Sequence, residues 1–88
     1  MLESSLQNAI KKALEKRGFY VVKLMVTSWN GMPDLLVLNN FGKAAFVEVK
    51  TPVGKLTRLQ TFIHLRLKLA HHQVFVIRSV EEARDLKF

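Results

Sequence analysis

The chain is 88 residues long, 49% of its residues are hydrophobic, and none is cysteine. This length fits a single domain over residues 1–88, and the lack of cysteine excludes disulfides and a cysteine-bound zinc site. Fourteen Lys and Arg against seven Asp and Glu leave a net charge of +7. That charge predicts a polyanionic partner, nucleic acid first, and a merely soluble basic domain is the plainer alternative.

The sequence gives no sign of membrane insertion or export. No apolar stretch reaches the roughly 18 residues of a membrane span, and the first residues lack the pattern of a signal peptide. We therefore expect a soluble, cytoplasmic protein.

The first predicted element is an amphipathic helix. Apolar residues recur at helical spacing from Leu6 to Leu14, with charged residues between them. Ser4 or Ser5 could cap its start, or Glu3 could lie in its first turn. Glu3 falls on the inner stripe of this helix, where it either complements the helix dipole or takes part in a site.

Three strands are predicted next, over residues 19–26, 32–38 and 43–50. Their connections are short, so they should be antiparallel. Trp29 lies in the first connection, residues 27–31, where it could stack on a base or cover the edge of the core.

A second helix follows, with two apolar stripes. One holds Leu56, Leu59, Ile63, Leu67 and Ala70, and the other holds Phe62, Leu65 and Leu69. The second stripe is either covered by the sheet or forms a further interface, such as that of a homodimer.

A fourth strand over residues 74–77 and a short last helix complete the predicted order. Ser79 and Glu82 form the capping box that opens this last helix. The connection through the second helix makes the third and fourth strands parallel. The fold class is therefore α/β, an α-β-β-β-α-β core with a mixed four-stranded sheet flanked by helices.

Charged residues interrupt two of the apolar runs. Asp34 stands at the start of the second strand, and Glu48 and Lys50 lie in the third. A buried charge is costly unless it is paired or holds a metal. Alternation along a strand puts Glu48 and Lys50 on one face, and Asp34 reaches the same face if the strands pair. Convergence of two acids and one lysine at the edge of the sheet is therefore the central expectation.

Two carboxylates form a hard oxygen site that suits Mg²⁺ together with water and a substrate phosphate. A bound cation would polarise a phosphate and lower the pKa of a water molecule. Lys50 could hold that water or stabilise negative charge on phosphorus. The alternative is a structural ion pair of Glu48 with Lys50 or Lys23.

The pattern Pro33-Asp34, thirteen residues, then Glu48-Val49-Lys50, on this order of elements, resembles the PD-(D/E)xK nuclease superfamily. The Gly31-x-Pro33-Asp34 form, Thr51 after Lys50 and Gln60 in the next helix resemble its VRR-NUC branch. The resemblance covers essentially the whole chain and implies a restriction-endonuclease-like fold.

The resemblance also implies roles for particular residues. Asp34, Glu48 and the backbone carbonyl of Val49 would bind Mg²⁺ or Mn²⁺, and Lys50 would position the nucleophilic water. Glu3 would assist the metal site, directly or through water.

Gln60 matches the helix glutamine of that family, which implies a place in the catalytic site. It has a competing interpretation, because Thr57-Arg58-Leu59-Gln60 also fits a capping box. Sequence pattern does not separate the two.

Stand-alone members of this branch resemble small junction resolvases that act as homodimers. The resemblance thus implies a metal-dependent, structure-selective DNA endonuclease acting on four-way (Holliday) junctions, encoded by a prokaryote or a virus. Lys55, Arg58 and Lys11 lead a wider basic set that would contact the DNA backbone and that also includes Lys12, Lys16, Arg17 and Lys23. The alternatives are a non-catalytic nucleic-acid-binding module with a nuclease-like fold, or the same chemistry on flap, nicked or linear duplex DNA.

Overall fold

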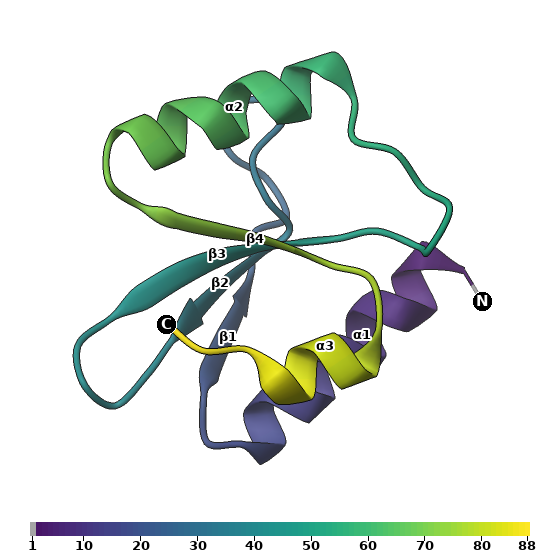
Figure 1. Cartoon of the computed structure of the whole chain (residues 1–88), viewed down its shortest axis with the longest axis vertical. Helices are drawn as coiled ribbons and strands as arrows, with labels where there is room; N and C mark the ends of the chain where they lie inside the picture. The colour runs from purple at the N-terminus through teal and green to yellow at the C-terminus, as the bar shows by residue number, and fades with distance from the viewer. Residues whose placement is uncertain (1) are drawn as a thin grey trace.

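A four-stranded mixed sheet separates helix α2, on one side, from helices α1 and α3 on the other (Figure 1). The computed structural model describes residues 2–88. The helices are α1 (Glu3–Lys16), α2 (Arg58–Leu69) and α3 (Val80–Asp85). The strands are β1 (Tyr20–Lys23), β2 (Leu35–Leu38), β3 (Ala44–Val49) and β4 (Gln73–Ile77).

The strands lie in the order β1-β2-β3-β4. β1 pairs antiparallel with β2 and β2 with β3, whereas β3 and β4, which α2 connects, are parallel. The predicted α-β-β-β-α-β order and mixed sheet are confirmed. The short α3 follows them and contacts α1.

The first two strands are shorter than predicted. β1 ends at Lys23 instead of Val26, and β2 begins at Leu35 instead of Met32. A bond from the Leu24 N–H to the Asp34 carbonyl, 2.8 Å long, closes the ladder. Residues 24–34, between these strands, leave the sheet as a loop. The strand predicted for Leu24, Met25 and Val26 is therefore wrong.

The helix starts also differ in detail from expectation. Neither Ser4 nor Ser5 caps α1, because Leu2 occupies the N-cap position and no side chain caps it. Glu3 lies in the first turn, as the other interpretation held. At α3, Ser79 accepts from the Glu82 N–H, but the Glu82 carboxylate accepts from the N–H of Arg78 instead of Ser79.

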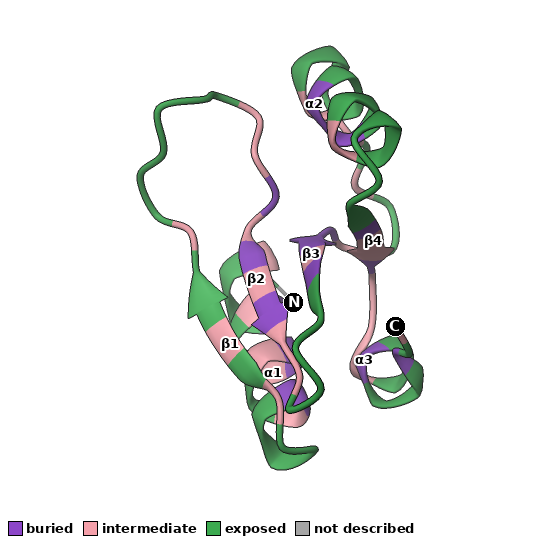
Figure 2. Ribbon diagram, turned by 90° about the vertical axis from the view of Figure 1, so that its left-hand side faces the viewer, coloured by how far each residue is buried: buried purple, intermediate pink, exposed green. Residues whose placement is uncertain are grey.

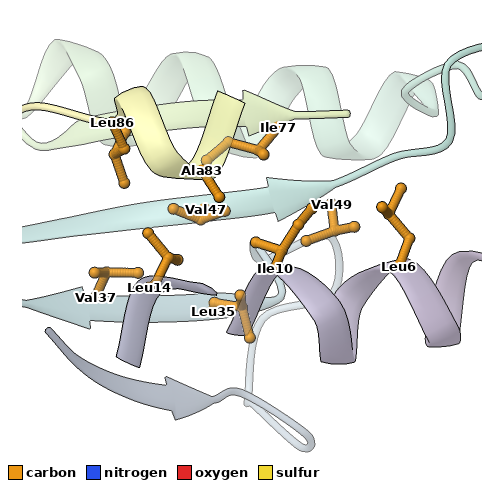
Figure 3. Close-up of a cluster of buried hydrophobic side chains, with 10 residues drawn as sticks. All are labelled: Leu6, Ile10, Leu14, Leu35, Val37, Val47, Val49, Ile77, Ala83 and Leu86. Carbon is orange, nitrogen blue, oxygen red and sulfur yellow. The ribbon is translucent and has the colours of Figure 1, made fainter. Parts of the chain in front are cut away.

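The apolar core lies between the sheet and the pair α1 and α3 (Figure 3). Ile10 and Leu14 of α1 are fully buried, as are Leu35 and Val47 of the sheet. Complete burial of such a side chain is worth about 1.5–3 kcal/mol. This face carries the hydrophobic stability of the domain, and its contacts fix the position of α1 against β3.

The opposite face of β3 is different, because charged and polar side chains are buried there. Glu48, Lys50 and His64 are all less than 9% exposed. Figure 2 shows that burial on α2 is confined to one stripe, while the rest of that helix is exposed. No helix within residues 2–88 is long and apolar enough to cross a bilayer.

Gly31 fixes the approach of the β1–β2 loop to α2. Its φ is +85°, and an added Cβ would lie 2.9 Å from Cγ of Leu59 and 3.2 Å from the Leu59 backbone carbon. Gly42, with φ +79°, has nothing within 4 Å of such a Cβ. Substitution of Gly42 therefore tests backbone strain alone, whereas substitution of Gly31 tests strain and steric contact together.

We predict that Gly42→Ala lowers the free energy of unfolding by about 1 kcal/mol through the left-handed backbone alone. Gly31→Ala should cost roughly 2–4 kcal/mol, because crowding against α2 adds to the same strain. Urea unfolding of both variants measures the difference. Equal losses would show that the loop does not pack closely on α2.

Candidate active site

Three carboxylates from separate elements meet at one end of the sheet. Glu3 comes from the first turn of α1, Asp34 immediately precedes β2, and Glu48 lies in β3. Each offers an oxygen atom, and these atoms lie within 4.8 Å of one another. Glu3 is the most exposed of the three, while Glu48 is 1% exposed. The structure thus brings together the three acids that the sequence analysis selected.

The register of β2 and β3 explains why Asp34 meets Glu48. Leu35 pairs with Val47, so the next position outward places Asp34 opposite Glu48. Opposed residues of an antiparallel pair direct their side chains to the same face. The regular ladder ends at this point, and Oδ2 of Asp34 accepts a 2.8 Å hydrogen bond from the Val49 N–H.

The backbone carbonyl of Val49 is directed toward the same place. The Lys50 N–H donates to the Ile77 carbonyl on β4 at 3.1 Å. Because the intervening peptide bond is trans, the Val49 carbonyl points the opposite way, toward β2 and Asp34. It could therefore join the carboxylates as a further oxygen ligand.

Burial makes ionisation of the Glu48 carboxyl group unfavourable. Its pKa is raised to about 8, first by burial and then by the charge of Asp34, while the charge of Lys50 opposes this shift. Within residues 2–88, neither oxygen of Glu48 has a hydrogen-bond partner. A buried carboxylate without partners costs on the order of 1–3 kcal/mol or more. A divalent cation, which prefers such oxygen ligands, would offset that cost.

Lys50 is 8% exposed and follows β3 directly. Alternation places it on the face of Glu48, and its charge acts on that carboxylate. Among the described residues, no ion pair joins Glu48 to Lys50 or Lys23. The structural ion pair considered as an alternative is therefore absent from residues 2–88, and Lys50 is near Glu48 without being bound to it.

Gln60 forms the capping box of α2. The Thr57 N–H donates to Oε1 of Gln60 at 3.0 Å, and the Gln60 N–H donates to Oγ1 of Thr57 at 3.1 Å. This confirms the capping interpretation of the Thr57–Gln60 pair. A place for Gln60 in the catalytic site stays a prediction.

His64 of α2 was not selected from the sequence, yet it faces the acids. It is 4% exposed, and its Nε2 lies 3.4 Å from Oε1 of Glu48. Burial, followed by the charge of Lys68, lowers the pKa of His64, so the imidazole is neutral near pH 7. No pattern in the sequence singled it out, because its contact with Glu48 depends on how α2 packs over β3.

The loop after β3 carries the exposed Lys55, and the exposed Arg58 begins α2. Arg78 holds this loop by donating to the carbonyls of Thr51 and Gly54 at 2.8 and 2.6 Å. These two hydrogen bonds therefore fix the loop backbone next to Lys55.

The other cations of the basic set differ in surroundings. Lys11 forms an ion pair with Glu15 one turn further along α1, 3.1 Å apart. Arg17, a member of that set, has a structural role, because it donates to the carbonyls of Ala83 and Leu86.

Trp29 is 53% exposed in the β1–β2 loop. Together with Met25 and Val26 it lines a hollow of 290 Å³, and it is not among the residues of the hydrophobic core. Its ring therefore remains available for contact with a partner.

The chain is similar to known proteins in both sequence and fold. The sequence profile of the VRR-NUC domain matches residues 2–81. A solved structure described as "VRR_NUC domain" superimposes with a TM-score of 0.84 at 34% sequence identity, covering 96% of this chain and 91% of that one. The fold and the family profile therefore agree.

A curated relative comes from Acyrthosiphon pisum secondary endosymbiont phage 1. It bears the name "Putative nuclease p44" and is 36% identical over 77 residues, which is 88% of this chain and 83% of that protein. The chain belongs to the VRR-NUC domain family, a family of nucleases.

The raised pKa of Glu48 predicts a pH dependence of stability in metal-free protein. In the folded state Glu48 keeps its proton up to about pH 8, whereas the ordinary pKa of a glutamate side chain is 4.5. The contribution of Glu48 to stability is therefore complete below pH 4.5 and is lost as the pH rises through 8.

Urea unfolding with EDTA should show Glu48→Gln gaining stability relative to the wild type between about pH 5 and about pH 9, by roughly 2–4 kcal/mol. Comparison of the two proteins cancels the titration of other groups. Parallel curves would mean that Glu48 ionises normally and is not buried among acids.

Proposed function

We propose that the protein is a metal-dependent, structure-selective DNA endonuclease that hydrolyses phosphodiester bonds, with four-way junctions as its substrate. One observation carries the proposal: Glu48 is buried without hydrogen-bond partners, beside two further acids and near Lys50. Such a donor set fits Mg²⁺ or Mn²⁺ and would be difficult to retain otherwise.

Asp34, Glu48 and the Val49 carbonyl would hold the cation, and Glu3 would complete the site directly or through water. When bound, the cation supplies positive charge that offsets the acids and polarises the phosphate. Lys50 orients the water that attacks phosphorus, and its ammonium stabilises the negative charge that develops there. Hydrolysis adds this water across the P–O bond that breaks.

DNA as the substrate is supported by the net charge of +7 and by the nuclease family. Lys55 and Arg58 follow β3 in the chain, and Lys11 lies on α1 beyond Glu3. They would contact phosphates without reading base sequence. Trp29, exposed in the loop that leads to Asp34, could stack on the unpaired bases of branched DNA.

The alternative is a non-catalytic module that only binds nucleic acid. A relict nuclease fold would be expected to lack a member of the acid–acid–lysine set, and here the set is intact. Flap, nicked and linear duplex DNA are alternative substrates for the same chemistry.

We predict that Asp34→Ala and Glu48→Ala each lower Mg²⁺-dependent cleavage of a labelled four-way junction more than about 100-fold, because each removes a cation ligand. Both should bind junction DNA at least as tightly as the wild type, since a negative charge is lost. Parallel reactions with flap, nicked and linear DNA, with and without Mg²⁺, define the preferred substrate.

Asp85→Ala is the matched control, because it removes an equal charge from the exposed end of α3 and should leave cleavage unchanged. Full cleavage by either active-site variant would refute the catalytic proposal and leave a DNA-binding module.

We also propose that the enzyme acts as a homodimer through α2. The stripe Phe62, Leu65 and Leu69 is 52–68% exposed, because α2 packs on β4 with its other side. The neighbouring sheet face adds Tyr20, 61% exposed, and Val22, 45% exposed. Exposed apolar surface of this kind marks an interaction site. A two-fold pair would present two active sites to the two strands of a junction.

Leu65→Glu combined with Leu69→Glu should convert the dimer to monomers, because buried unpaired carboxylates would face each other in the interface. Sedimentation velocity at micromolar concentration measures the mass, with and without junction DNA. Phe41→Glu is the control, since Phe41 is 87% exposed in the β2–β3 hairpin. A monomeric wild type under both conditions would contradict the dimer.

A further inference from the structure

The buried side-chain atoms without a hydrogen-bond partner within residues 2–88 belong to only two residues. They are both carboxylate oxygens of Glu48 and Nε2 of His64. These groups face each other across the gap between β3 and α2, with Nε2 3.4 Å from Oε1. The coincidence of two unpartnered groups in contact requires an explanation.

The separation of 3.4 Å is slightly longer than the 2.7–3.2 Å typical of an N–H···O hydrogen bond. A small shift and rotation of the two side chains would form the bond and satisfy one atom of each residue. Once Glu48 is ionised, as it would be with a cation bound, this bond has a charged acceptor and is stronger than one between neutral groups. The pair is thus arranged to close without rearrangement of either backbone.

The type of donor matters at this position. A lysine or arginine beside Glu48 would satisfy the carboxylate but would compete with a cation for its charge. A neutral imidazole donates one hydrogen bond and leaves the negative charge in place.

We propose that His64 is a positioning residue, whose Nε2–H holds Oε1 of Glu48 and so presets this carboxylate for a divalent cation. The inference rests on the metal site of the proposed function. In metal sites, a group that orients a ligand in this way typically contributes 10–100-fold to metal affinity. Packing of α2 on the sheet is the competing role, and it needs no N–H donor.

Two near-isosteric variants separate these roles. His64→Gln keeps an amide N–H that can reach Glu48, whereas His64→Met has similar length and no donor. Mn²⁺ binding to the free protein, measured by electron paramagnetic resonance without DNA, is the readout. His72→Leu is the control, because His72 contacts the edge of Phe46, with ring centroids 6.2 Å apart.

We expect His64→Met to weaken Mn²⁺ binding about 10–100-fold, and His64→Gln to stay within a few-fold of the wild type. His72→Leu should bind Mn²⁺ as the wild type does. Circular dichroism and thermal unfolding confirm that each variant is folded. If His64→Met does not fold, His64→Leu takes its place as the variant without a donor.

Equal Mn²⁺ affinity of folded His64→Met and the wild type would overturn the positioning role while leaving the metal site intact. A comparable loss in folded His64→Met and His64→Gln would also overturn it, because the donor would then be irrelevant. Absence of Mn²⁺ binding to the wild type would overturn both the positioning role and the proposed metal-dependent function.

Discussion

The pairing of β2 with β3 is the constraint on which the site depends. Leu35 opposite Val47 is the last pair of the ladder, and the position beyond it brings Asp34 to Glu48. At that point the chain before β2 turns away into its loop, so the Val49 N–H bonds to the Asp34 carboxylate instead of a strand. The carboxylate oxygens of Asp34 and Glu48 therefore lie close together where the pairing of β2 and β3 ends. A slip of one residue would send Glu48 into the apolar core.

One face of the sheet carries the apolar core, and the other carries the candidate active site. The face toward α1 and α3 is a continuous apolar core (Figure 3). The face toward α2 buries Glu48, Lys50 and His64, which is energetically unfavourable without partners. The core can sustain this cost because its contacts do not involve the charged groups. The fold therefore holds these groups in place although their burial is itself unfavourable.

Much of this architecture follows from the sequence, for identifiable reasons. Helical periodicity indicated α1 and α2, and the acids within apolar runs indicated that Asp34 and Glu48 converge. The loop before β2 was misjudged because Met25 and Val26 are typical strand residues, yet they are 78% and 95% exposed. His64 was missed because its importance arises from the placement of α2 over β3. Such a tertiary contact leaves no periodic or motif signal in a single sequence.

The central claim is that these carboxylates form a divalent-cation site. Anomalous diffraction from a crystal soaked in Mn²⁺ tests it most directly, because it locates the ion without reference to activity. We expect an anomalous peak between Asp34 and Glu48, within coordination distance of the Val49 carbonyl oxygen. A fully soaked crystal with no peak there, or with Mn²⁺ only at other carboxylates, would contradict it.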